Sequence, residues 1–248
     1  MHLRHSIFKI AILSGTILMS GPIASAQSDK ATAVINEMIA ALGGKSFLDV
    51  REIQATGKVF VFKRDQMAGT DSFWDYIKFP DKERQETGTY RIKPTLIFNG
   101  DSGWSVYDKK VDAAPPAEIM DFQAGMKTSF QYLSRFILNR PGLSLLHAGT
   151  EMLNFKRNDV IEFRDSGNFF RLFVDQQSHL PTKLEVRRSG ESFMREEQFA
   201  NWHEFQGIPT ALYIIHYKDG ERNTEIRFDN VGYNSGLAES LFVPPAAR

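Results

Sequence analysis

The chain has 248 residues, of which 42% are hydrophobic, and its 30 basic residues are balanced by 30 acidic ones. A neutral chain without a concentrated basic patch is not expected to bind nucleic acid. Cysteine is absent, which excludes disulfides, thiolate metal sites and a lipidated cysteine. The length and the apolar content indicate a globular protein that can bury a sizeable core.

Residues 1–26 have the features of a cleavable export signal. Arg4 and Lys9 give a basic start, an apolar run extends from Ile10 to Ile23, and Ala24-Ser25-Ala26 has the small-x-small pattern of a signal peptidase site. The run is too short, and too broken by glycine and proline, to favour a membrane anchor. We therefore expect an exported, soluble protein with a single domain at residues 27–248.

The mature chain is predicted to begin with a helix and to continue as strands. Residues 28–45 place Val34, Ile35, Met38, Ile39 and Leu42 on one helical face before Gly43-Gly44. From Ile53 onward, turn residues separate short apolar runs, a pattern typical of antiparallel hairpins. The predicted strands are 53–63, 71–79, 83–92, 95–100, 103–108, 159–165, 168–176, 181–189, 191–202, 210–218 and 223–233. Such a series indicates a mainly β protein with helices (α+β), built on one large curled antiparallel sheet.

Residues 115–142 interrupt the strands with a helical pattern. Apolar side chains recur at helical spacing from Ile119 to Ile137, Gly125 is a candidate break, and Asn139 before Arg140-Pro141 should end the segment. One interpretation is a core helix packed on the sheet. The other is a movable cover over an apolar cavity, because methionine and phenylalanine adapt to flexible ligands.

The candidate cavity-lining residues follow from this pattern. They are the apolar strand positions Phe60, Phe62, Phe73, Ile77, Phe98, Trp104, Phe170, Leu172, Val174, Tyr213 and Ile215, with Phe122, Met126, Phe130 and Leu133 from the helical cover. Ordinary core packing is the alternative interpretation for each of them. The facing of the strands is the sensitive step, since an error of one residue inverts it.

The tetrapeptide Gly100-Asp101-Ser102-Gly103 resembles the start of the nucleophile loop of chymotrypsin-like serine proteases. A catalytic serine needs a histidine base, and the only histidines before Ser102 are His2 and His5, inside the signal. Residues 99–103 are explained fully by a hairpin turn. We therefore predict a turn and no catalytic role for Ser102.

The other titratable residues show no catalytic or metal-binding spacing. The histidines after the signal form no His-x-His or His-x-x-x-His pair. Carboxylates beside Arg or Lys favour cross-strand ion pairs at Glu83, Glu86, Glu196 and Glu197, and Arg187-Arg188 is typical of a solvated strand end. We expect no metal, no cofactor and no enzymatic activity, and an unrecognised hydrolase is the least favoured alternative.

The order of several segments resembles the LolA-like and LolB-like superfamily of periplasmic lipoprotein carriers. These segments are "WDYIKFPDKERQE" (74–86), "LIFNGDSGWSVYD" (96–108), the Phe-rich insert, "FRLFVDQQSHLPTKLEV" (170–186) and "NVGYNSGLAESLFVPPA" (230–246). Residues 41–59 look like exported members described as outer-membrane lipoprotein-sorting proteins. The resemblance spans most of residues 30–246.

This resemblance implies an incomplete β-barrel, closed by helices, in the periplasm of a Gram-negative bacterium. Its cavity would hold acyl chains of a lipid or lipoprotein for transport to the outer membrane, as a monomer that meets inner- or outer-membrane transfer proteins. Phe79 stands where the family carrier has the arginine that holds its lid shut, and Arg84 and Arg91 are the candidate replacements. The alternative is an interaction or scaffold module of the cell envelope that uses the same sheet without lipid transport.

Overall fold

The computed structural model describes residues 21–88, 93–108 and 110–245. The first twenty residues of the predicted signal lie outside this range, so the signal and the domain bounds stay predictions. Within the described part, no helix has the length and apolar character needed to span a membrane.

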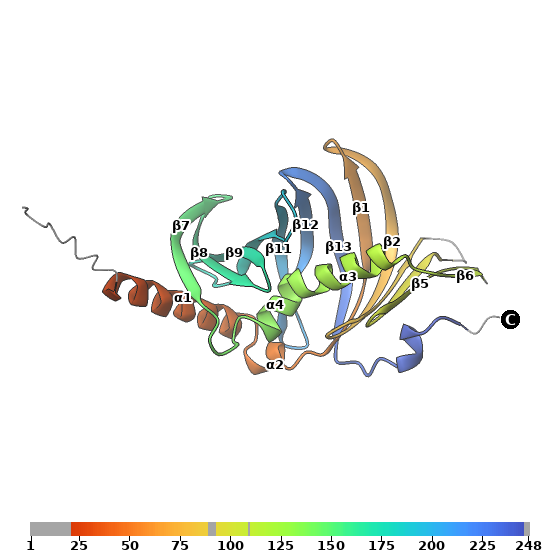
Figure 1. Cartoon of the computed structure of the whole chain (residues 1–248), viewed down its shortest axis with the longest axis horizontal. Coiled ribbons are helices and arrows are strands. Elements are labelled where there is room, and N and C mark those ends of the chain that lie inside the picture. The colour runs from red at the N-terminus through yellow and green to blue at the C-terminus, as the bar shows by residue number, and fades with distance from the viewer. Residues whose placement is uncertain (1–20, 89–92, 109, 246–248) are drawn as a thin grey trace, which may run out of the picture.

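The described residues form one antiparallel sheet of 13 strands in the order β6-β5-β4-β3-β2-β1-β13-β12-β11-β10-β9-β8-β7 (Figure 1). One half contains β1 (Glu52–Lys63), β2 (Gln66–Lys78), β3 (Lys82–Thr87), β4 (Thr95–Asn99), β5 (Ser102–Tyr107) and β6 (Lys110–Ala113). The other contains β7 (Leu145–Leu153), β8 (Lys156–Asp165), β9 (Asn168–Asp175), β10 (Pro181–Arg187), β11 (Arg195–Phe205), β12 (Ile208–Lys218) and β13 (Glu221–Tyr233). The predicted curled sheet is confirmed, and it does not close into a barrel.

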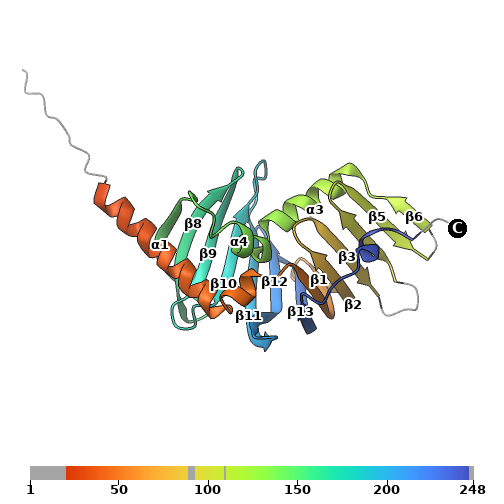
Figure 2. The same ribbon diagram turned by 90° about the horizontal axis from the view of Figure 1, so that it is seen from below.

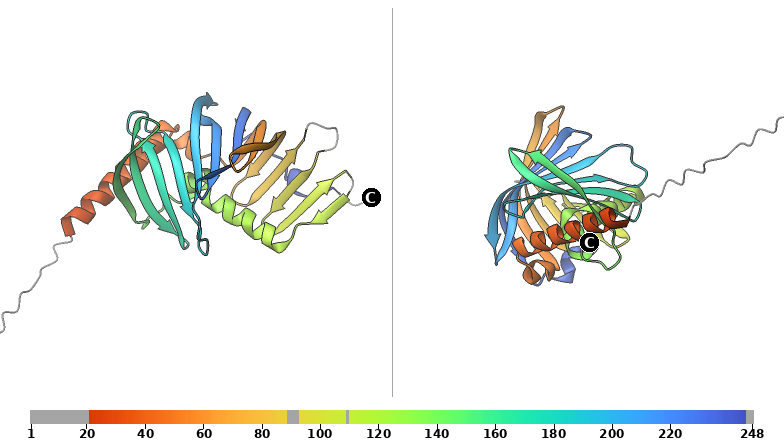
Figure 3. Two further views of the ribbon diagram at one scale, coloured as in Figure 1. Left: turned by 90° about the horizontal axis from the view of Figure 1, so that it is seen from above. Right: turned by 90° about the vertical axis from the view of Figure 1, so that its left-hand side faces the viewer.

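The two halves explain why a helical segment interrupts the strands. Successive hairpins lead outward from β1 to the edge strand β6, and a second series leads inward from the opposite edge, β7, to β13, which pairs with β1. The chain must therefore cross the whole sheet between Ala113 and Leu145. Figure 3 shows the sheet curving around the helices that make this crossing.

The helices lie in a row along the concave face (Figure 2). They are α1 (Gly21–Ala41), α2 (Lys45–Leu48), α3 (Pro116–Thr128) and α4 (Phe130–Phe136), and a 3-10 turn, η1 (Glu239–Phe242), follows the last strand. The expected break at Gly125 is wrong, because the break falls at Ser129. Ser129 is extended with ψ 149°, and its hydroxyl caps α4 by accepting from the backbone N–H of Tyr132 at 3.3 Å.

The main core lies between the helices and the concave face. The predicted apolar face of α1 is buried there, with Met38 and Leu42 completely inaccessible. Strand residues complete the layer, among them Ile161, Phe170, Leu172 and Leu184. Burial of these side chains stabilises the fold by roughly 1.5–3 kcal/mol each.

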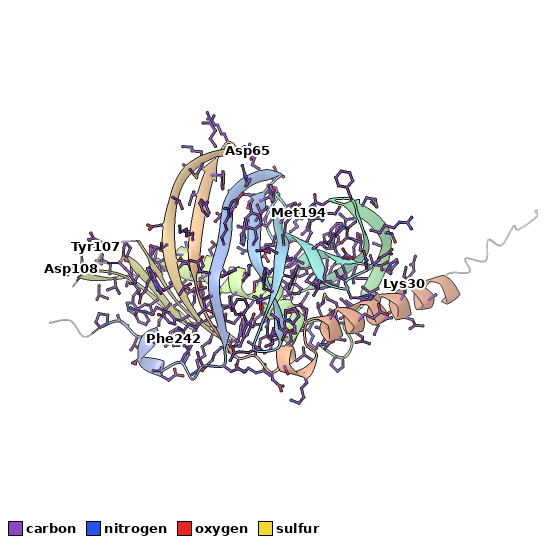
Figure 4. All side chains as sticks on the ribbon, turned by 180° about the vertical axis from the view of Figure 1, so that it is seen from behind. Lys30, Asp65, Tyr107, Asp108, Met194 and Phe242 are labelled. Atoms are coloured by element: carbon purple, nitrogen blue, oxygen red, sulfur yellow. The ribbon has the colours of Figure 1, made fainter. Side chains whose placement is uncertain are left out.

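The C-terminal segment covers the outer face of the β3–β5 strands. Figure 4 labels Phe242 in this segment, and its side chain is fully buried. Asn99 Nδ2 donates to the carbonyl of Phe242 at 3.3 Å, and Arg84 Nη1 donates to the carbonyl of Leu241 at 3.3 Å. Arg84 therefore fastens the C-terminal segment rather than a helical cover, and Arg91 lies outside the described residues.

Candidate functional site

A cavity of about 340 Å³ lies between the concave face and the α3–α4 segment. Its apolar walls come from strands far apart in the sheet and from α3: Ile77, Phe79, Met126, Leu184 and Val186. Polar side chains complete the lining, including Glu83, Arg188, Glu197 and His216. The site is therefore an apolar pocket with a few polar groups, which is the usual composition of small-molecule sites.

Arg188, directly after β10, holds α3 over this cavity. Its Nη1 lies 2.7 Å from Asp121 Oδ1, and its Nε donates to Thr128 Oγ1 at 3.2 Å. A Cβ at Gly125 would lie 3.2 Å from Arg188 Nη2, so glycine leaves room for the guanidinium. The expectation of a solvated strand end is wrong for Arg188, whose side chain is only 12% exposed.

Aromatic contacts and one amide hold the cover elsewhere. The rings of Phe98 and Phe122 stack with centroids 4.2 Å apart. Gln123, one residue further along α3, donates to the Gly100 carbonyl at 3.0 Å and to Asp101 Oδ1 at 2.8 Å. The turn before β5 thus acts as a docking point for α3.

Phe79 and Arg135 form the contact between the sheet and α4. The rings of Phe79 and Phe136 meet edge to face with centroids 5.7 Å apart. The Arg135 guanidinium carbon lies 5.7 Å from the Phe79 ring centroid and 4.0 Å from that of Phe47, and its Nε donates to the Phe47 carbonyl at 3.1 Å. Burial lowers the pKa of Arg135 to about 10. The arginine at this contact therefore comes from the helical segment, and the strand supplies an aromatic ring.

Asp75 and Glu83 place two carboxyl groups beneath the cover. Asp75 pairs with Gln85 and Ile77 pairs with Glu83 across β2 and β3, so the two acids are diagonal neighbours on one face. Burial raises the pKa of Glu83 to about 7 and, together with the neighbouring Glu83 charge, raises the pKa of Asp75 well above its ordinary value. The expected ion pair of Glu83 is wrong, because no basic side chain among the described residues bridges it.

Glu197 and His216 form a second, half-buried polar pair, opposite each other on β11 and β12. Burial raises the pKa of Glu197 to about 7, although the carboxyl accepts a hydrogen bond from the backbone N–H of Phe130. Burial lowers the pKa of His216 to about 4, and its Nε2 has no hydrogen-bond partner in the described part of the chain. The predicted ion pair of Glu197 is also wrong. A cross-strand ion pair exists for Glu196, to Lys183 at 3.8 Å. Glu86 pairs instead with Arg84 of its own strand at 2.9 Å and with Lys93, just before β4, at 3.7 Å.

The predicted cavity residues separate into three groups, of which two lie on the concave side of the sheet. Ile77 and Met126 line the cavity. Most of the others belong to the surrounding core or pack against it: Phe73, Phe122, Phe130, Leu133, Phe170, Leu172 and Val174, with Phe98 stacked on Phe122. Their roles in ligand binding stay predictions.

Five predicted residues lie on the other face of the sheet: Phe60, Phe62, Trp104, Tyr213 and Ile215. The concave side of β1 carries Ile53, Ala55 and Val59, so Phe60 and Phe62 point outward, beneath the guanidinium groups of Arg227 at 4.7 Å and Arg222 at 3.8 Å. Tyr213 and Ile215 line a separate groove of about 540 Å³. Trp104 pairs with Ile97, and because side chains alternate along a strand, it points away from the face that carries Phe98.

The structure offers no catalytic arrangement at Ser102. The residue is exposed at the start of β5, and Asn99 pairs with it across the predicted turn. In the described ranges, no three residues among His, Asp and Glu form a group suited to a metal ion.

The comparisons with known proteins place this fold. No protein-family model matches the chain, and no curated protein matches its sequence. An outer membrane lipoprotein-sorting protein domain from Vibrio parahaemolyticus superposes with a TM-score of 0.55 and 17% identity, over 87% of this chain and 97% of that one. A DUF1329 family protein from Desulfovibrio piger gives 0.56 at 13% identity, over 88% and 99%. A LolA superfamily protein from Nitrosomonas europaea gives 0.56 at 10% identity, over 86% and 97%. The chain therefore has a LolA-like fold.

Proposed function

We propose that this protein is an exported, non-enzymatic binding protein that holds an acyl chain of a lipid or lipoprotein under the α3–α4 cover. The observation that carries the proposal is the cavity between the concave sheet and a helical segment held by a few separable contacts. We place the protein in the periplasm of a Gram-negative bacterium, where such a carrier would move its cargo toward the outer membrane. Inner- or outer-membrane transfer proteins would be its partners.

The size of the cavity limits its cargo in the closed form. About 340 Å³ lies near the lower end of the range for ligand pockets, roughly 300–1,000 Å³. One chain therefore suits the closed form, and a larger lipid requires α3 to move. The contact between Arg188 and Asp121 is weak enough for this, because the Asp121 side chain is 70% exposed and exposed ion pairs contribute about 0–1 kcal/mol.

The test is mass spectrometry of the protein purified from its native compartment without detergent. The protein is denatured and extracted, and an acylated species near one per protein is the expected result. A lipid carrier processed in parallel controls for loss of ligand. An empty protein beside a loaded control, together with failure to bind a fluorescent apolar probe that carries no charge, would refute the proposal.

A second candidate function is an interaction module of the cell envelope. Phe155, in the turn between the edge strand β7 and β8, has a positive φ of 62° and is fully exposed, and Met152 on β7 is 64% exposed. An exposed apolar tip on a sheet edge is a typical protein contact. Crosslinking in cells through a photoreactive residue at position 155 should yield one defined protein adduct, and its absence would argue against this function.

A further inference from the structure

We infer that the cavity selects an amphiphile whose apolar part ends in an amine, with the amine received by the carboxylates of Glu83 and Glu197. The apolar part would lie against Ile77, Met126 and Leu184. This inference depends on the proposed function, since it names the chemical class of the ligand that the cavity holds.

The acids under the cover have no cationic partner. The ion pairs of the described residues include none for Asp75, Glu83 or Glu197. A buried carboxylate without a counter-charge is costly, and the cost falls when a cation is brought to it. The interior of the cavity is therefore complementary to a positive charge.

The basic residues near the cavity are engaged by other groups. Arg188 contacts Asp121, and Arg195 Nη2 lies 2.7 Å from Glu191 Oε1. Lys218 lies over the Phe193 ring, with Nζ 4.1 Å from the ring centroid. Arg188 and Arg195 are thus paired with other acids at the rim, and none of the three cations forms an ion pair with Glu83 or Glu197, although the charge of Arg188 lowers the pKa of Glu197.

The unpartnered polar atoms also fit an amine. Asp75 Oδ1 and His216 Nε2 are buried and have no hydrogen-bond partner in the described structure. His216 lines the cavity beside Glu197. Asp75 is the diagonal neighbour of Glu83, with which it shares a side-chain hydrogen bond, so it supports Glu83 and does not itself line the cavity. An ammonium group offers three donors and no acceptor, which matches a site built from carboxyl oxygens and a neutral imidazole. A fatty-acid carboxylate would instead meet like charge.

The curvature of the sheet brings the acids to one site. Glu83 is on β3 and Glu197 is on β11, with four strands between them in the sheet order, yet both line the same cavity. The apolar walls lie among them. Both acids and the apolar walls therefore border one space, where an apolar chain and its amine can be bound together.

The test compares decylamine, decanol and decanoate, which share one chain length, as competitors of a fluorescent apolar probe at pH 8. Both carboxyls are mostly ionised there, because their pKa values are about 7. We expect decylamine to bind at least about tenfold more tightly than decanol, and decanoate to bind most weakly. In Glu83→Gln and Glu197→Gln, the affinity for decylamine should fall toward that for decanol, which should itself change little.

Glu86→Gln is the matched control, because Glu86 is on the same strand as Glu83 but pairs with Arg84 outside the cavity. Equal affinity of wild-type protein for all three compounds, or tighter binding of decanoate, would overturn the amine assignment while leaving apolar binding intact. Failure of all three, and of the probe, would overturn the proposed function as well. The ligand series in wild-type protein decides the matter even where a variant does not fold.

Discussion

Glu197→Gln should change how the stability of the protein depends on pH. The Glu197 carboxyl is desolvated beneath α4, and its pKa rises from 4.5 to about 7. Between these values the unfolded chain releases the Glu197 proton while the folded chain retains it. Its contribution to stability is therefore fully present below pH 4.5 and is lost as the pH rises through 7.

The size of the effect follows from the difference between the two pKa values. One pKa unit corresponds to about 1.36 kcal/mol, so the full contribution of Glu197 is about 3 kcal/mol. The side chain is half-buried by accessible area, which makes this an upper value because residual solvent exposure screens the charge. Glutamine has nearly the same shape, keeps a carbonyl that accepts from the N–H of Phe130, and carries no proton to lose.

The assay is urea unfolding of wild type and Glu197→Gln at a series of pH values from 4.5 to 8. The variant should gain up to about 3 kcal/mol relative to wild type across this range, with the midpoint of the change near pH 6. Glu196→Gln is the control, because this neighbour on β11 pairs with Lys183 and its replacement should not stabilise the protein as the pH rises. A flat difference for Glu197→Gln would refute the assignment of a desolvated carboxyl.

Three further changes test the cover, the sheet and the turn. Arg188→Ala should destabilise the protein by about 1 kcal/mol and speed hydrogen exchange in α3. Arg187 is an exposed neighbour, so Arg187→Ala should do neither. Equal exchange in both variants would argue that Arg188 does not hold α3 on the sheet. Gly57→Ala should lower the free energy of unfolding by about 3 kcal/mol, because the new Cβ would lie 2.1 Å from the Arg227 carbonyl oxygen. Thermal or urea unfolding measures this loss, and a near-neutral result would contradict the close packing of β1 on β13. Ser102→Ala should change stability by less than about 0.5 kcal/mol and abolish no activity on ester substrates, and loss of a measured activity would revive the hydrolase alternative.

Local pattern was sufficient for most of the elements. Hairpin turns and apolar runs placed strands in the regions now occupied by β1–β5 and β8–β13, and the apolar face of α1 was identified residue by residue. The two strands that the sequence did not indicate, β6 and β7, are the edges of the sheet. An edge strand is paired on one side only, so β6 has four mostly exposed residues and β7 contains an irregularity at Gly149. Neither shows the regular alternation that indicates a strand.

The sequence by itself therefore determined the class of the fold, because periodicity and turn chemistry are local properties. Only the tertiary structure decided which face each strand presents, and Phe60 and Tyr213 lie opposite to the prediction because side chains alternate and a step of one residue inverts them. The tertiary structure also decided which distant residues come together in the candidate site. Glu83 and Glu197 are 114 positions apart in the chain, and each has basic neighbours in sequence. Their lack of an ion-pair partner, and the limited contact of both acids with water, arise only from the way the curved sheet and α3–α4 pack around them.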